Sequence, residues 1–177
     1  KYYKYNSNRL LSEYIEPETG STLYEYDTNG NLILKTNANN QVIQNKYNNR
    51  NKLIAAYFNN EAPVKYFSYD NNGNLISAKT QDNEWGYKYD ENNNLTNANF
   101  VYKDKYFNFE YKYNNLNYLE NIIYPSKKEI NFNPNILGQV SQIGDFVRDI
   151  QYATKGDIVS YNYANGVKFN KLIILQK

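Results

Sequence analysis

Hydrophobic and polar residues alternate with a period of two along short segments of the chain, and these segments meet at clusters of Asp, Asn and Gly. The segment YEYDTNGNLI at residues 24–33 has this pattern, and it returns as FSYDNNGNLI at 67–76 and, more loosely, as YKYDENNNLT at 87–96. Alternation predicts half-buried β-strands, and Asn-Gly clusters between them predict tight turns. We therefore expect β-hairpins arranged in tandem.

The second aromatic residue of each Y-x-Y unit marks the repeat. The markers are Tyr5, Tyr26, Tyr47, Tyr69, Tyr89, Tyr113, Phe132, Tyr152 and Phe169. A period of about 20 to 22 residues over nearly the whole chain is the signature of a repeat array. We predict one all-β array over residues 1–177, in which about eight tandem antiparallel β-hairpins form a continuous curved sheet with almost no helix.

The residues after each marker predict the turn. Asp27-Thr28-Asn29-Gly30 has Asp at the first and Gly at the fourth position, as a type I turn prefers, and a left-handed Gly then makes a hairpin loop with a bulge. The expected turn residues are Asp27, Asn29, Gly30, Asp70, Asn72, Gly73, Asp90, Asn165 and Gly166. Asn51, Asn93 and Asn117 stand where other copies have Gly, and Asn also tolerates the left-handed conformation.

This turn predicts the register of the hairpin. Asp27 should face Asn31, Tyr26 should face Leu32, and Tyr24 should face Leu34. One face then carries aromatic and aliphatic side chains in rows along the sheet. The expected aromatic ladder comprises Tyr24, Tyr26, Tyr47, Tyr69, Tyr87, Tyr89, Tyr111, Tyr113 and Tyr152.

Some positions break the pattern. Arg9 and Ile136 stand where Gly or Asn is expected, so the first hairpin and the one near Phe132 should be irregular. Pro125 and Pro134 bracket a less regular stretch. The final KLIILQK is typical of a strand, and we expect its edge to be covered.

The amino-acid composition argues against several classes of function. The net charge is +2, without the concentrated basic excess of a dedicated nucleic-acid surface. Cys and His are absent, which excludes disulfides, thiolate metal sites and Ser–His or Cys–His catalysis. No apolar run is long enough to span a membrane. Met is also absent, and we expect the chain to be a segment of a longer protein.

The repeated segments resemble the RHS or YD-repeat family. The matching pieces are YEYDTNGNLI, FSYDNNGNLI and YKYDENNNLT, together with GDIVSYNYANGVKF near the end of the sequence. The resemblance covers about eight repeats, essentially the whole chain. This sequence often has Asn where the family favours Gly or Arg, and its later repeats lose the Asp.

The resemblance implies a β-hairpin strip that forms a hollow shell. In bacterial RHS polymorphic toxins and Tc-type toxins such a shell encloses a toxic domain, and in teneurins a similar shell belongs to an adhesion ectodomain. The implied function is a non-catalytic wall segment of a large secreted or cell-surface protein of a bacterium. Its partners would be the rest of the parent shell and the enclosed cargo domain. No cofactor is implied.

Three other chemistries are disfavoured by the residues themselves. Asp27-x-Asn29-x-Asn31 superficially resembles a calcium loop, but the Gly and Glu that such a loop needs at its sixth and twelfth positions are missing. Lys and aromatic residues alternate in VYKDKYFNFEYKY as in a single-strand nucleic-acid platform, yet acidic residues among them cancel the charge. The carboxylates Asp90-Glu91 and Asp145/Asp149 could act as acid and base, but no sequence feature places two of them across a cleft.

A carbohydrate-binding or adhesion module is the main alternative to a shell. Exposed tyrosine rows can stack on sugars, and the single tryptophan, Trp85, is the candidate glycan contact. A bulky side chain near the start of a strand is the favoured explanation of Trp85. Carbohydrate-binding repeats usually depend on Trp and Gly, whereas this chain depends on Tyr-Asp and Asn-Gly.

Overall fold

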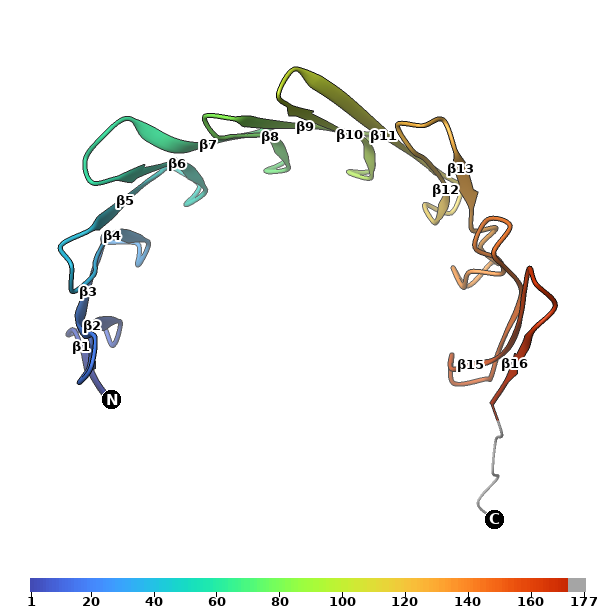
Figure 1. The fold of residues 1–177 in the computed structure, drawn as a ribbon, viewed down its shortest axis with the longest axis horizontal. Coiled ribbons are helices and arrows are strands. Elements are labelled where there is room, and N and C mark those ends of the chain that lie inside the picture. The colour runs from blue at the N-terminus through green and yellow to red at the C-terminus, as the bar shows by residue number, and fades with distance from the viewer. Residues whose placement is uncertain (172–177) are drawn as a thin grey trace, which may run out of the picture. The chain divides into compact units, whose positions relative to one another are not determined.

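A computed structural model describes residues 1–171 of the chain, and every regular element in that range is a β-strand. Thirteen strands follow one another in chain order, each hydrogen-bonded to the next, and three further strands form a second sheet (Figure 1). The pairs are antiparallel. This confirms the predicted all-β array of tandem hairpins, while the expected strand in KLIILQK lies almost entirely outside the described residues.

The chain divides into two compact units, and the boundary between Trp85 and Gly86 falls inside strand β9 (Asn83–Tyr89). The strands of the first unit are β1 (Tyr2–Tyr5), β2 (Leu11–Glu16), β3 (Gly20–Tyr26), β4 (Leu32–Thr36), β5 (Val42–Tyr47), β6 (Leu53–Phe58), β7 (Pro63–Tyr69) and β8 (Leu75–Lys79).

The second unit contains both the end of the long sheet and the short sheet. Its strands are β10 (Leu95–Tyr102), β11 (Lys105–Tyr113), β12 (Leu119–Ile123), β13 (Glu129–Asn131), β14 (Val147–Tyr152), β15 (Ile158–Tyr163) and β16 (Lys168–Asn170). Between β13 and β14 the chain forms only two isolated bridges, Pro134↔Val140 and Ile143↔Val147. The predicted continuous sheet is therefore interrupted, and the irregularity expected near Phe132 is confirmed.

The hairpins have a second irregularity that the turn sequence does not reveal. Asp27 and Asn31 face each other through a backbone hydrogen bond, and Tyr26 is opposite Leu32, as predicted. The register then shifts, so that Tyr24 faces Lys35 and not Leu34. A β-bulge directly after the turn adds one residue to the returning strand, which moves Leu34 to the opposite face.

The first hairpin is regular, contrary to the expectation from Arg9. Arg9 adopts the left-handed conformation with φ 62°, and Tyr5 pairs with Leu11 across the same bulge as in later copies. The local hydrogen bonds of the turn are sufficient to hold a non-glycine residue in this conformation. The prediction for Asn51, Asn93 and Asn117 is confirmed, since all three have positive φ.

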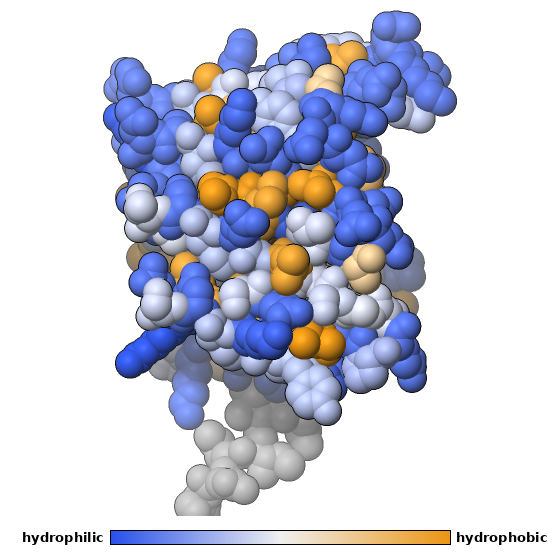
Figure 2. Space-filling model, turned by 90° about the vertical axis from the view of Figure 1, so that its left-hand side faces the viewer, coloured by the Kyte–Doolittle hydropathy of each residue, from blue (hydrophilic) through white to orange (hydrophobic). Residues whose placement is uncertain are grey.

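The sheet has very little enclosed core. Among the described residues the buried apolar side chains are Ala55, Ala56, Ala98, Ile130 and Ile150, and no large side chain is fully buried. On the face drawn in Figure 2, hydrophobic residues gather in short groups separated by hydrophilic ones. Stability therefore depends on contacts between neighbouring strands and turns, as is typical of repeat arrays.

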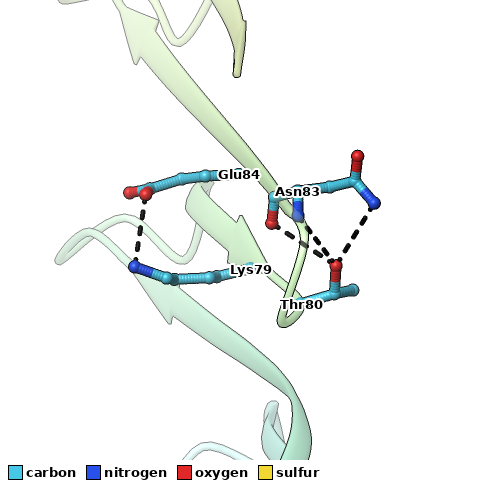
Figure 3. A network of polar contacts seen from close by, with 4 residues as sticks. All are labelled: Lys79, Thr80, Asn83 and Glu84. Carbon is cyan, nitrogen blue, oxygen red and sulfur yellow. Dashed lines mark hydrogen bonds and ion pairs between the residues drawn. The ribbon is translucent and has the colours of Figure 1, made fainter. Parts of the chain in front are cut away.

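The loops at the edge opposite the repeated turns are held by polar contacts. Between β8 and β9 the Thr80 backbone N–H donates to the Asn83 carbonyl at 2.8 Å. The Thr80 hydroxyl oxygen accepts the Asn83 backbone N–H at 3.1 Å, and Lys79 pairs with Glu84 at 3.3 Å (Figure 3). Both charged side chains are about half exposed, so this ion pair contributes at most about 1 kcal/mol.

Candidate functional site: the turns and the tyrosine ladder

Most of the repeated turns are closed by a side-chain oxygen at their first position; the turn after Tyr152 begins at Ala153 and is closed by backbone hydrogen bonds. The Asp27 carboxylate accepts the backbone N–H of Asn29 at 3.0 Å and of Asn31 at 2.8 Å, and its other oxygen accepts the Asn31 side-chain amide. Asp70 and Asp90 make the same set of contacts. Asn replaces Asp at this position in the repeated turns that begin at Asn6, Asn48, Asn114 and Asn135, and Asn37 closes the β4–β5 turn at the opposite edge in the same way.

These contacts perturb the turn carboxylates. Hydrogen bonds from the side chain and backbone of Asn31 lower the pKa of Asp27, and Asn94 does the same for the pKa of Asp90. At Asp70 partial desolvation opposes the shift, but hydrogen bonds from Asn74 outweigh it and the pKa is again lowered. The carboxylates are therefore engaged as acceptors within their own turns.

The fourth position of each turn has the left-handed conformation. Gly30 and Gly73 have φ of 83° and 87°. The late turn at Asn165 and Gly166 begins at Tyr163, whose carbonyl accepts the Gly166 N–H, and Asn165 Oδ1 accepts the Val167 N–H. The turn after Phe132 begins instead at Asn135, so Pro134 and not Phe132 occupies the position before the turn.

Asparagines connect successive turns within each unit. Asn51 Oδ1 accepts the side-chain amides of Asn29 at 3.1 Å and Asn31 at 2.8 Å, both from the preceding turn. In the second unit Asn117 Oδ1 accepts those of Asn92 and Asn94 in the same way. Asn at the left-handed position thus also serves as an acceptor, a role that the sequence pattern did not indicate.

Marker tyrosines connect successive hairpins. In both units the tyrosine hydroxyl donates to a backbone carbonyl of the preceding hairpin. The acceptor is the first residue of that hairpin's second strand, and for Tyr152 it is Val140, which has the corresponding position after its turn. The pairs and their O···O distances are Tyr26 to Leu11 at 2.9 Å, Tyr47 to Leu32 at 3.0 Å, Tyr69 to Leu53 at 2.9 Å, Tyr113 to Leu95 at 3.1 Å and Tyr152 to Val140 at 2.9 Å.

All nine ladder tyrosines are half-buried, and the residue between each Y-x-Y pair is exposed, as at Glu25, Lys88 and Lys112. Tyr24 lies under Lys35, with the ammonium 5.8 Å from the ring centre. Desolvation raises the pKa of Tyr69, Tyr111 and Tyr113. Trp85 is the third residue of β9 and is half-buried.

Each carboxylate considered for catalysis has a separate structural partner. Asp90 closes a turn, Asp145 pairs with Arg148 at 2.9 Å, and Asp149 accepts the Asn162 amide at 2.7 Å. Within residues 1–171 there is no cluster of three acidic, His or Cys side chains that could hold a metal ion. None of those residues forms a helix with the length and hydrophobicity needed to cross a membrane.

Solved structures of Tc toxins have a similar fold. The chain superposes on TcdB2-TccC3 without its hypervariable C-terminal region with a TM-score of 0.78 and 10% identity, covering 94% of this chain. It superposes on the Tc holotoxin pore of Photorhabdus luminescens with a TM-score of 0.57 and 14% identity, covering 90%. It spans 10% and 11% of the lengths of those chains. No protein-family model and no curated protein sequence matches the chain significantly.

These Tc toxin structures contain RHS shell repeats. The chain therefore has the RHS/YD type of hairpin-repeat fold that its repeated segments predict. At this level of identity the similarity establishes the fold and leaves the function to be argued from the residues.

Proposed function

We propose that this chain is a non-catalytic wall segment of an RHS/YD-type shell that encloses a toxin or effector cargo in a large exported or surface protein of a bacterium. The observation that carries the proposal is the tether between consecutive hairpins. A tyrosine hydroxyl such as that of Tyr69 donates to the backbone of the preceding hairpin, at Leu53, while an Asp or Asn such as Asp70 closes its own turn.

The contacts between neighbouring hairpins are of the kind that a continuous shell wall needs. Except between β13 and β14, consecutive hairpins are joined by strand pairing. At several steps a tyrosine hydroxyl within the sheet or an asparagine at the turn edge adds a further link. Turn side chains such as Asp27 and Asn29 bond within their own turn or to the next turn, and among residues 1–171 no large side chain is fully buried. The partners under this proposal are the remaining repeats of the parent shell and the enclosed cargo.

The test is electron microscopy of the intact parent protein with this segment located in the map. We expect a closed hollow particle whose wall contains the segment, and an enclosed domain that resists added protease until the particle is disrupted. An open strip with both faces in contact with solvent, or a parent protein whose cargo is digested as fast as free cargo, contradicts the proposal.

A further inference from the structure

An open groove of about 560 Å³ lies between the β5–β6 turn and the β7–β8 turn of the first unit. Its volume is in the range that small ligands occupy. The half-buried rings of Tyr47 and Tyr69 line it, and so do the exposed cations Arg50 and Lys52. The groove therefore combines aromatic and cationic groups at one place on the array.

The groove exists because this step lacks the asparagine bridge found elsewhere. The third and fifth residues of one turn, Asn29 and Asn31, donate to Asn51 of the next turn. At the following step the equivalent donors are Arg50 and Lys52, and the equivalent acceptor position is Gly73, which has no side chain. A Cβ added at Gly73 would lie 3.7 Å from Lys52 Cε, so the space is large enough for a side chain.

The groups that line the groove need an anionic, acceptor-rich ligand. Arg50 donates to the Asn71 carbonyl but has five N–H donors in all, and Lys52 Nζ lies 5.8 Å from the centre of the Tyr69 ring. The Asp70 carboxylate is already used by its own turn. The side-chain amides of Asn49 and Asn71 make no hydrogen bond within residues 1–171, so they are free to bond hydroxyl groups.

We propose that this groove binds a carboxylate-bearing sugar, such as a uronic acid residue of an acidic glycan. The carboxylate would pair with Arg50 and Lys52, since charge-assisted contacts to a guanidinium are among the stronger hydrogen bonds. The apolar face of the sugar ring would pack on a tyrosine ring, and the ring hydroxyls would bond the amides. This site does not depend on the shell proposal, and it places a glycan contact at the turn edge, not at Trp85.

The first test is an NMR titration of the whole chain with methyl β-D-glucuronide, methyl β-D-glucoside and acetate. We expect glucuronide to shift the amide signals of residues 48–52 and 70–73, with binding at least about tenfold weaker for the neutral glucoside and for acetate. Equal binding of glucoside overturns the role of the cations, equal binding of acetate overturns the sugar, and no shift with glucuronide at tens of millimolar overturns the site.

The second test uses variants that leave the fold intact. Arg50→Gln and Lys52→Gln should each weaken glucuronide binding about tenfold, whereas Arg9→Gln, which removes a cation from the first turn, should not. Gly73→Asn should abolish binding, because its amide would close the groove as Asn51 closes the preceding step. Gly30→Asn is the matched control, since its Cβ would lie 3.8 Å from Leu10 Cδ1 in an equivalent turn. Undiminished binding by Gly73→Asn with unchanged thermal stability would overturn the proposal.

Discussion

The Tyr47 hydroxyl donates to the backbone carbonyl of Leu32 at 3.0 Å, and the Asn45 side chain donates to the same oxygen at 3.0 Å. Leu32 opens the returning strand of the preceding hairpin, and the pairing of β4 with β5 covers only Leu34 to Thr36, so Leu32 lies beyond that ladder. An unpaired carbonyl in a sheet costs free energy, and the tyrosine supplies the missing donor. The marker tyrosine and the carbonyl beyond the end of the ladder therefore act as one device that joins consecutive hairpins.

The contribution of this device can be measured at Tyr69. Tyr69→Phe removes the hydrogen bond to Leu53 and should lower the free energy of unfolding in urea by about 1 kcal/mol. Tyr47→Phe should cost less, because Asn45 continues to donate to Leu32. Tyr24→Phe is the control, since the Tyr24 hydroxyl makes no hydrogen bond within residues 1–171. Equal losses for Tyr24→Phe and Tyr69→Phe would show that the tether contributes nothing.

Two glycines separate the effect of backbone conformation from that of packing. Gly138 and Gly166 have φ of 76° and 86°, but a Cβ at Gly138 would lie 2.7 Å from the Tyr118 ring, whereas nothing lies within 4 Å at Gly166. Gly166→Ala should cost about 1 kcal/mol for the left-handed conformation alone. Gly138→Ala should cost about 1–3 kcal/mol more, because the Tyr118 ring must move. Similar melting temperatures for the two variants would contradict this packing.

The asparagine bridge predicts a specific cost for Asn51→Gly. Glycine keeps the left-handed conformation but removes the oxygen that accepts from Asn29 and Asn31, so stability should fall by about 0.5–1.5 kcal/mol. Asn40→Gly is the matched control, because Asn40 has φ 58° and its side chain bridges to no other turn among the described residues. Urea denaturation of both variants measures the difference, and a loss confined to Asn40→Gly would exclude the bridge.

The turn aspartates predict a loss of stability in acid. Because the folded pKa values of Asp27, Asp70 and Asp90 are lowered, their contribution is present above the unfolded value of about 3.9 and disappears as the pH falls through the folded values. Replacing all three with Asn keeps an acceptor, as Asn48 does, and removes the titration. Melting temperatures between about pH 5 and pH 2 should fall less for this variant than for the parent chain. Glu13 and Glu16, whose pKa values are also lowered, account for a residual slope.

The local features of this protein follow from its sequence. The repeat, the strands on either side of each Asp-x-Asn-Gly, and the pairing of Tyr26 with Leu32 depend on a few neighbouring residues, because turn conformation is decided by side chains that bond their own backbone. For the same reason Asn51, Asn93 and Asn117 could be identified as substitutes for Gly. Arg9 shows the limit of predicting turns from sequence. Its turn is held by hydrogen bonds of Asn6 and Leu10 and therefore tolerates a residue with a weaker preference for the left-handed conformation.

The tertiary structure decided the rest. The bulge that turns Tyr24 toward Lys35, the interruption between β13 and β14, and the tether from Tyr69 to Leu53 all involve backbone groups, and backbone carbonyls are the same at every position of a sequence. The groove beside Gly73 likewise depends on a contact between turns that is missing, because Gly73 has no side chain to accept from Arg50 or Lys52. Contacts between repeats become visible only when the hairpins lie side by side, which is why the sequence predicted the fold of each hairpin and the structure was needed to show how the hairpins are joined.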